Sequence, residues 1–482
     1  MKPIIQSISV KNFKSLRDTG TLSLKPITLL VGPNSSGKTA LLQSILVLKQ
    51  TLESGNIEIP LVLRGKYVDL SSFRDVVFRH NVKDDIEVSL GFSQEITWSI
   101  KFGVGYEEES GRLVQRYMEF SIMENSEKRI RLDEGKIVVK EGEKTLYELK
   151  KPKEEIEKRN FLYRPTFFLQ GLTSYLDHAK YIKEKLSELK SRKLRDEALE
   201  RLFQSELDEM KTAEAEIKRL FGEISIEQLK TLHFLMNALK DRSTYLQRLL
   251  VENTYYIGPL REYPQRYYIA SGEYPRDVGL RGEHTAEVIY FDFRRGDQQY
   301  ERFRYWVREM GLAHDVKISP VAEGLYTLSI IDPNVKIEVG LADIGFGASQ
   351  LLPIIVEGIY AKTGSVLLVE QPEIHLHPKL QAALMDFLIE IAEEGKQVIV
   401  ETHSEHLILR LQRRIAEGKL SHADVAIYYF EGSENGSKIT QVELNENGTI
   451  KTWPKGFFEE DLEESFSLLK ALSRRGKNVF SG

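Results

Sequence analysis

Nine consecutive residues near the N-terminus have the types and the spacing of a phosphate-binding loop. The segment 31–39 reads VGPNSSGKT. Its glycines allow backbone N–H groups to curl around a phosphate, its lysine reaches the outer phosphate oxygens, and its threonine hydroxyl can ligate magnesium. The residues expected to contact a bound nucleotide are Gly32, Pro33, Asn34, Ser35, Ser36, Gly37, Lys38, Thr39 and Ala40.

A carboxylate ends a later apolar run, 366–369, which reads VLLV and is followed by Glu370. Open α/β sheets bind ligands at the carboxyl ends of their strands. We therefore expect Glu370 to hold Mg²⁺ through water, opposite Thr39. His375 and His377 follow and could be metal ligands, but the chain has no cysteine and Pro378 comes next, so they fit a turn better.

Two further segments bring polar residues to a possible phosphate site. The run 397–400, QVIV, is followed by ETHS, in which His403 could touch a γ-phosphate. Ser404 as a hydrolase nucleophile is disfavoured, because no Gly-x-Ser-x-Gly surrounds it. The segment 341–350, LADIGFGASQ, runs into an apolar helix expected from Leu351. A glycine-rich loop that opens a helix is a second anion-binding terminus, with a plain helix cap as the alternative.

The elements that position these residues can be predicted from hydrophobic pattern. The run 27–31, ITLLV, indicates a buried strand before the loop, and 40–46, ALLQSIL, indicates a helix after it. Alternating residues from Ile86 to Tyr147 indicate antiparallel hairpins, and 180–251 has the spacing of amphipathic helices with charged outer faces. In the tail, 425–444 indicates a hairpin and 461–472 a helix.

Composition narrows the class of protein. The 482 residues carry a net charge of −5 and include no cysteine, which excludes disulfides, thiolate zinc sites and cysteine nucleophiles. The near balance of charge argues against nucleic-acid binding through bulk positive charge, although a local basic groove stays possible. No signal-peptide core or membrane-length apolar run is present, so we expect a cytoplasmic protein with no membrane contact.

The order of these motifs resembles the ABC-type ATPase heads of the overcoming-lysogenization-defect (OLD) class and its AAA-family relatives. Segments 256–261 and 453–461 extend the resemblance to a standalone prokaryotic branch whose C-terminal domain has no assigned function. It implies an α/β P-loop NTPase head with a mixed sheet flanked by helices, an antiparallel β lobe and an inserted helical region. The expected domains are 1–95 and 256–432 for the head, 96–255 for the insertion and 433–482 for the tail.

The resemblance also implies an ATP-dependent homodimer. In such heads the signature loop of one subunit closes over the γ-phosphate held by the other, which would place Gly345, Gly347, Ser349 and Gln350 on the partner's nucleotide. His403 matches the switch histidine. Arg261 is either a further phosphate or interdomain contact or part of a structural ion pair. The usual glutamine loop has no clear match. Around 69–75, no single residue can be chosen as its substitute.

Gln371 is the main departure from the family pattern, because related ATPases have a second acid there. An amide can orient water but cannot accept its proton, and general-base help contributes about 10²–10⁴-fold in rate. We therefore expect slow hydrolysis. Either Glu373 serves as a substitute base, or slow turnover lets long-lived ATP-closed dimers act as a timer.

The resemblance leaves the partner of the ATPase open. Nuclease members of the OLD class continue into a Toprim domain, for which the 79 residues from Ser404 to Gly482 leave no room. We therefore expect a regulatory ATPase that works with a separate effector, such as a nuclease, in antiphage defence or DNA maintenance. The alternative is a nucleic-acid-binding repair ATPase that needs no effector. A transporter subunit is disfavoured, because the signature and glutamine loops are spelled differently.

Overall fold

The chain forms two compact units that interleave in sequence. The computed structural model describes residues 1–56, 59–93, 95–123, 126–133, 136–150, 226–296, 298–344, 346–452 and 454. Unit 1 combines Met1–Ile4, Ser23–Leu42 and Thr254–Gly482, and unit 2 combines Ile5–Leu22 and Gln43–Asn253. Helix α1 (Lys38–Glu53) begins in unit 1 and continues in unit 2. The expected domain divisions after residues 95, 255 and 432 stay a prediction.

The larger sheet of unit 1 contains all three strands that were expected to carry the site residues at their ends. Its six strands lie in the order β11 (Thr254–Ile257), β16 (Val366–Glu370), β17 (Gln397–Glu401), β4 (Ile27–Val31), β18 (Val425–Glu431) and β19 (Lys438–Gln441). The first five are parallel, and β19 forms the expected antiparallel hairpin with β18. Every residue of β4, β16 and β17 is buried, as in parallel sheets that are covered on both faces.

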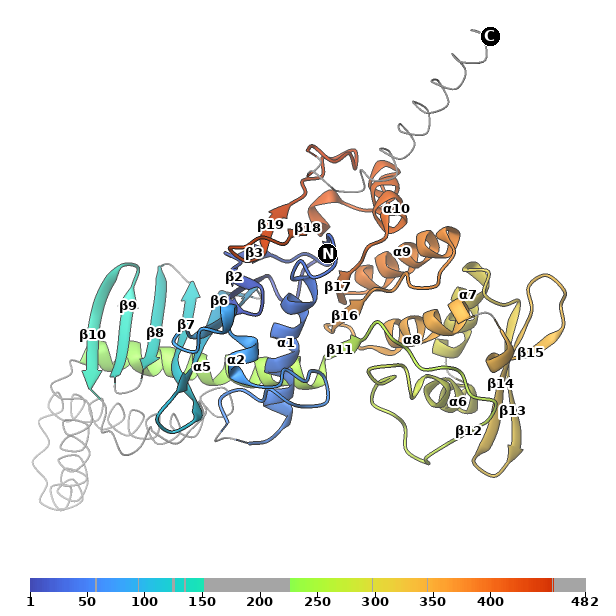
Figure 1. Cartoon of the computed structure of the whole chain (residues 1–482), viewed down its shortest axis with the longest axis horizontal. Coiled ribbons are helices and arrows are strands. Elements are labelled where there is room, and N and C mark those ends of the chain that lie inside the picture. Colours follow the sequence, from blue (N-terminus) through green and yellow to red (C-terminus); the bar gives the residue numbers. More distant parts are fainter. Residues whose placement is uncertain are drawn as a thin grey trace, which may run out of the picture. The chain divides into compact units, whose positions relative to one another are not determined.

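Two helices of unit 1, α8 (Phe346–Tyr360) and α9 (Pro378–Glu393), pack on this sheet, and α6 (Thr285–Arg295), α7 (Gln298–Glu309) and α10 (Glu405–Ala416) pack on those two (Figure 1). Short 3-10 turns lie at Leu341–Asp343 and His422–Asp424. Helix α8 contacts β11, and α9 contacts β4 and β17. Trp306 of α7 packs edge-on against Phe387 of α9, with ring centroids 5.1 Å apart. These contacts fix the elements from which the loops after β4, β16 and β17 emerge.

A second, smaller sheet in unit 1 was not expected from the sequence. It consists of β12 (Tyr268–Ile269), β14 (Leu325–Ile331), β13 (Asp315–Ala322) and β15 (Glu338–Gly340), paired antiparallel. Tyr326 of β14 is buried and stacks on Tyr290 of α6, with ring centroids 4.3 Å apart. The sheet thus packs against α6 through aromatic side chains.

Unit 2 is built on a nine-stranded sheet and confirms the hairpins expected between Ile86 and Tyr147. Its main path, antiparallel throughout, is β10 (Lys144–Lys150), β9 (Lys136–Glu141), β8 (Glu127–Asp133), β7 (Arg112–Met123), β6 (Thr97–Glu107), β5 (Ile86–Ser93), β1 (Ser7–Phe13) and β2 (Leu16–Asp18), with β3 (Leu22–Ser23) paired to β1. Short helical turns lie at Phe73–Val76 and Phe78–His80.

One helix, α5 (Ile226–Glu252), lies along this sheet (Figure 1). It confirms part of the helical region expected at 180–251. The remainder, like the helix expected at 461–472, lies outside the described residues. Tyr245 of α5 packs edge-on against Trp98 and Phe92, at 5.9 and 6.0 Å between ring centroids, and these two rings stack at 4.1 Å. Across the described ranges, no helix is both long enough and apolar enough to cross a bilayer.

The aromatic cluster under α5 gives a test of this packing. Trp98 is 1% exposed, so Trp98→Ala should lower the free energy of unfolding by about 3–5 kcal/mol, through lost burial and the cavity left behind. Met123, on the same sheet and 49% exposed, provides a control, and Met123→Ala should change stability by no more than about 0.5 kcal/mol. Chemical denaturation measures both, and equal effects would contradict the packing described.

Candidate nucleotide site

The predicted loop leaves the carboxyl end of β4 and enters the N-terminus of α1, which confirms the strand, loop and helix order. The backbone has positive φ at Gly32 (133°), Ser35 (59°) and Gly37 (106°). A Cβ atom on Gly32 would lie 2.2 Å from the carbonyl oxygen of Phe430. Only glycine is therefore tolerated at position 32. Lys38 and Thr39 are the first two residues of α1, where unpaired N–H groups attract anions.

The polar groups of the loop fit a bound phosphate. Ser36 is 1% exposed, and within the described part of the chain its hydroxyl has no hydrogen-bond partner. The ammonium of Lys38 donates to the carbonyls of Gly32 and Pro33, at 2.9 and 2.7 Å. Burial lowers the pKa of Lys38, and the charges of Glu401 and Glu373 oppose that shift. A buried ammonium and an unpaired hydroxyl in one loop are suitable donors to phosphate oxygens.

The carboxylate that contacts Thr39 belongs to Glu401, a residue to which the sequence analysis assigned no role. The Thr39 hydroxyl donates to Oε1 and Oε2 of Glu401, at 2.9 and 2.8 Å. Glu401 ends β17, which lies between β4 and β16. The sequence did contain a signal for Glu401, because it ends a fully buried strand as Glu370 does. That Glu401 lies beside Thr39 depends on the order of the strands, which cannot be read from the sequence.

Glu370 lies next to Glu401, because the two residues are register partners at the ends of β16 and β17. Glu370 is 5% exposed and accepts a hydrogen bond of 2.9 Å from the hydroxyl of Tyr256 on β11. Burial and the adjacent Glu370 carboxylate raise the pKa of Tyr256, so the phenol stays a donor. The structure thus brings two carboxylates to one edge of the sheet, and the magnesium role expected for Glu370 stays a proposal.

Glu373 joins the ends of the same two strands. Its carboxylate accepts hydrogen bonds from the Thr402 hydroxyl (2.8 Å) and from the backbone N–H of His403 (2.6 Å). Burial raises its pKa, and these hydrogen bonds oppose the shift. Gln371 has a φ of 42°, and its N–H donates to the carbonyl of Glu401 at 2.7 Å. The turn after β16 is therefore tied to β17 at two points.

Arg261 holds this turn from the other side. It is 3% exposed, and its guanidinium donates to the carbonyls of Glu370 (2.7 Å) and Gln371 (3.2 Å). Burial lowers its pKa to about 10, although Glu373 and Glu370 favour the charged form. The sequence left a phosphate contact and an ion pair open for Arg261. Its hydrogen bonds instead go to main-chain oxygens, so its structural role is to support the strand end.

His403 lies near the candidate site, whereas His377 and Ser404 cap helices. His403 is an exposed residue, but partial desolvation of its imidazole and the charge of Lys38 lower its pKa, which favours neutral imidazole at neutral pH. Ser404 is the N-cap of α10 and accepts from the N–H of Leu407, which explains this serine without a nucleophilic role. His377 caps α9. Among the described residues, no three His, Cys, Asp or Glu side chains are grouped to hold a metal.

The signature segment differs from expectation in where its helix begins. Helix α8 starts at Phe346 rather than Leu351, so Gly347, Ser349 and Gln350 lie inside it, while Gly345 falls outside the described residues. Gly347 packs closely in this first turn, because a Cβ at its position would lie 2.5 Å from the carbonyl oxygen of His375. Gly347 therefore has a role within its own chain, and its expected contact with a partner's nucleotide stays a prediction.

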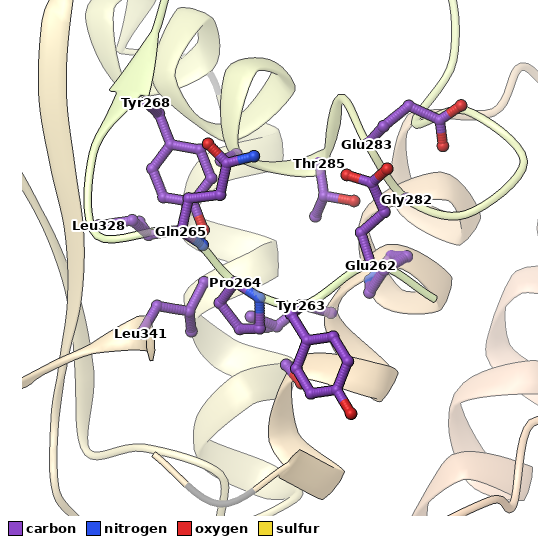
Figure 2. Close-up of a pocket in the computed structure, with 14 residues that line it drawn as sticks. Glu262, Tyr263, Pro264, Gln265, Tyr268, Gly282, Glu283, Thr285, Leu328 and Leu341 are labelled. Carbon is purple, nitrogen blue, oxygen red and sulfur yellow. Dashed lines mark hydrogen bonds between the residues drawn. The ribbon is translucent and has the colours of Figure 1, made fainter. Parts of the chain in front are cut away.

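Ser349 and Gln350 are 5% and 1% exposed. Figure 2 shows a pocket beside α8, to whose lining Ser349, Leu352 and Pro353 contribute. The rest of the lining comes from Glu262, Tyr263, Pro264, Gln265, Tyr268, Gly282, Glu283, Thr285, Ala286, Leu328 and Leu341. Ser349 thus lines this pocket in the described conformation, and contact with a second subunit's nucleotide is a prediction for a different state.

The support provided by Arg261 can be tested through stability. Arg261→Met removes the guanidinium from the buried carbonyl of Glu370, at about 1–3 kcal/mol for an unsatisfied group, and Arg261→Lys should cost less. The carbonyl of Gln371 keeps its long hydrogen bond from the N–H of Ile374, at 3.4 Å. Arg266 is a control of the same type, because its side chain is 69% exposed and pairs with Asp343. Arg266→Met should cost at most about 1 kcal/mol. If denaturant titration gives equal losses for Arg261→Met and Arg266→Met, Arg261 does not support the turn.

Comparison with known proteins agrees with this geometry. Residues 1–408 match the family described as AAA ATPase domain, and residues 420–468 match a protein family of unknown function, DUF3696. No curated protein matches the chain.

Similar solved structures include heads of Smc proteins. The Smc head of Pyrococcus furiosus bound to the C-terminal domain of ScpA is 13% identical, with a TM-score of 0.38 over 98% of this chain and 99% of that one. The head from Thermotoga maritima is 10% identical, with a TM-score of 0.36 over 92% and 100%. These scores are too low to carry an argument. The family match covers most of the chain and includes the loop and both carboxylate-bearing strand ends, so this protein belongs to the AAA ATPase domain family.

Proposed function

We propose that this AAA-family ATPase binds ATP with Mg²⁺, dimerises around the nucleotide, hydrolyses it slowly and thereby regulates a separate effector protein. The observation that carries the proposal is the meeting of Lys38 and Thr39 with the carboxylate of Glu401 at the end of β17, beside its register partner Glu370 at the end of β16. Magnesium would be held between Thr39 and these carboxylates, where it would neutralise phosphate charge. The loop binds the phosphates, and His403, neutral and next to Lys38, would sense the outermost one.

Slow hydrolysis follows from the groups at the end of β16. Gln371 has no proton-accepting carboxylate, and its backbone is fixed by Glu401 and Arg261. Both oxygens of Glu373 accept hydrogen bonds from the residues that follow β17, which orient its carboxylate within the turn. We infer that Glu373 holds the turn and that turnover lacks a strong general base.

Dimerisation and an effector rest on the resemblance to OLD-class heads. The N-terminus of α8, with Gly345 and Gly347, would approach the nucleotide of a second copy, and Ser349 and Gln350 would support that helix from within. The segment 420–468, which matches a family of unknown function, is a region that an effector could contact. A nuclease acting in antiphage defence is the kind of effector that the resemblance suggests, with DNA as its substrate.

Loss of the Lys38 ammonium tests nucleotide binding and dimerisation together. Lys38→Ala should abolish measurable ATP affinity in calorimetry, because it removes the buried cation of the loop. Wild-type protein should double its mass in light scattering when ATP and Mg²⁺ are added, and the variant should not. Lys379→Ala is the control, because Lys379 is an exposed lysine in the first turn of α9.

Unchanged affinity in Lys38→Ala would refute the nucleotide site. Binding without any change in mass would leave the site intact and refute the ATP-dependent dimer. A dimer already present without ATP would show the same mass in both conditions, so the state of the wild type without nucleotide must be measured first.

Single-turnover hydrolysis tests the reason for slow turnover. Gln371→Glu should speed hydrolysis, because it restores a proton acceptor of nearly the same size. Glu373→Gln should reduce thermal stability more than rate, since an amide cannot accept the hydrogen bonds of Thr402 and His403 with both of its polar atoms.

A fall of about 10²-fold or more in the rate of Glu373→Gln, with folding and ATP affinity preserved, would instead identify Glu373 as the base. Wild-type turnover well above about 10 per second, the median for enzymes, would contradict slow hydrolysis whatever the variants do.

A further inference from the structure

Glu401 occupies the centre of the candidate site, although nothing in the motif pattern assigns it a role. It closes β17, and its register partners are Leu30 on the strand that enters the phosphate loop and Glu370 on the opposite neighbour. It is 3% exposed. Its carboxylate therefore lies between the residues that bind phosphate and those that end β16.

The contacts of Glu401 leave its buried negative charge only partly compensated. Burying a carboxylate is costly unless an opposite charge compensates it. The Lys38 ammonium is 4.0 Å from Glu401 Oε1, beyond hydrogen-bond distance, and it donates to loop carbonyls instead. Both oxygens of Glu401 share the single proton of the Thr39 hydroxyl. The Lys38 ammonium at the outer limit of an ion pair and one shared hydroxyl proton therefore compensate this buried negative charge only in part.

The same hydrogen bond prepares Thr39 for a metal. A threonine hydroxyl has one proton and two acceptor lone pairs. Because the hydroxyl donates its hydrogen bond to Glu401, the oxygen lone pairs of Thr39 can act as ligands to a cation. Mg²⁺ in nucleotide sites takes one or two carboxylates in addition to phosphate oxygens and retained waters. Glu401 and its neighbour Glu370 supply two carboxylates at this edge.

We propose that Glu401 is a positioning residue for the nucleotide-bound magnesium: it orients the Thr39 hydroxyl toward the ion and holds the ion through water, alongside Glu370. The proposal rests on the proposed function, because it concerns the metal of the same nucleotide. It also has a consequence for the metal dependence of ATP binding. Without magnesium the negative charge of Glu401 repels the phosphates, so this residue makes ATP binding depend on the metal.

Calorimetry with and without metal tests this role. ATP is titrated into wild-type protein, Glu401→Gln, Glu370→Gln and Glu405→Gln, in Mg²⁺ and in EDTA. Glu401→Gln keeps an oxygen for Thr39 and removes only the charge, so it should lose about 10–100-fold of the affinity gained from Mg²⁺, the usual loss when a supporting ligand is removed. In EDTA it should bind ATP at least as tightly as wild type. Glu405, at the start of α10, is the matched control and should behave as wild type.

Two further measurements separate positioning from general damage. Manganese titrations followed by electron paramagnetic resonance, in the presence of ATP, report metal affinity without catalysis, and should show the same loss in Glu401→Gln. Thr39→Ala and Glu401→Gln combined should be less damaging than the sum of the two single changes, because both act through one hydrogen bond. Glu401→Asp keeps the charge and should retain part of the metal affinity, which covers the case in which Glu401→Gln does not fold.

The outcomes that overturn the proposal are distinct from a failure of the proposed function. If Glu401→Gln, or Glu401→Asp in its place, keeps the full effect of Mg²⁺, or if the loss occurs in Glu370→Gln alone, then Glu401 does not position the metal. If wild-type protein binds ATP in neither Mg²⁺ nor EDTA, the nucleotide site itself is refuted. Purely additive effects of Thr39→Ala and Glu401→Gln would refute the shared action through the hydroxyl.

Discussion

The hydrogen bond from Thr39 to Glu401 is the contact on which the geometry of this site depends. It joins the first turn of α1 to the end of β17, and so connects the phosphate loop to the strand that separates it from β16. Because β17 is central, any group at its end is within reach of both neighbours. A carboxylate there places negative charge where a nucleotide-bound cation would lie, next to the only turn of backbone shaped for phosphate among the strand ends described above.

The surrounding contacts tie the turn after β16 to its neighbours. Glu373 ties the turn after β16 to Thr402 and His403, and Arg261 holds the carbonyls of Glu370 and Gln371. The hydrogen bond from Arg261 to the carbonyl of Glu370 joins buried groups, which are expensive to leave unpaired. The turn therefore has little freedom to rearrange. An active site built in this way favours orientation of the metal and phosphates over rapid proton transfer.

Gly347 and Gly32 illustrate how glycines serve two purposes in such a site. Gly32 allows the loop to turn, and it also lets the loop approach Phe430. Gly347 lies in the first turn of α8 and packs against His375, so its small size is required within the chain itself. A motif that suggests contact with a second subunit can thus have an internal packing reason. The two roles are compatible, because packing of one face leaves the helix end available.

The sequence by itself determined the phosphate loop, the buried strands at 27–31, 366–370 and 397–401, and the hairpins of unit 2, because each is written in local spacing of glycines, charges and apolar residues. It also placed Glu370 and His403 at strand ends. Tertiary structure alone decided that Glu401 meets Thr39, that Arg261 binds main-chain carbonyls, and that α8 begins at Phe346. The first two facts depend on strand order and on contacts between segments more than a hundred residues apart, and no local pattern encodes which strand lies beside which.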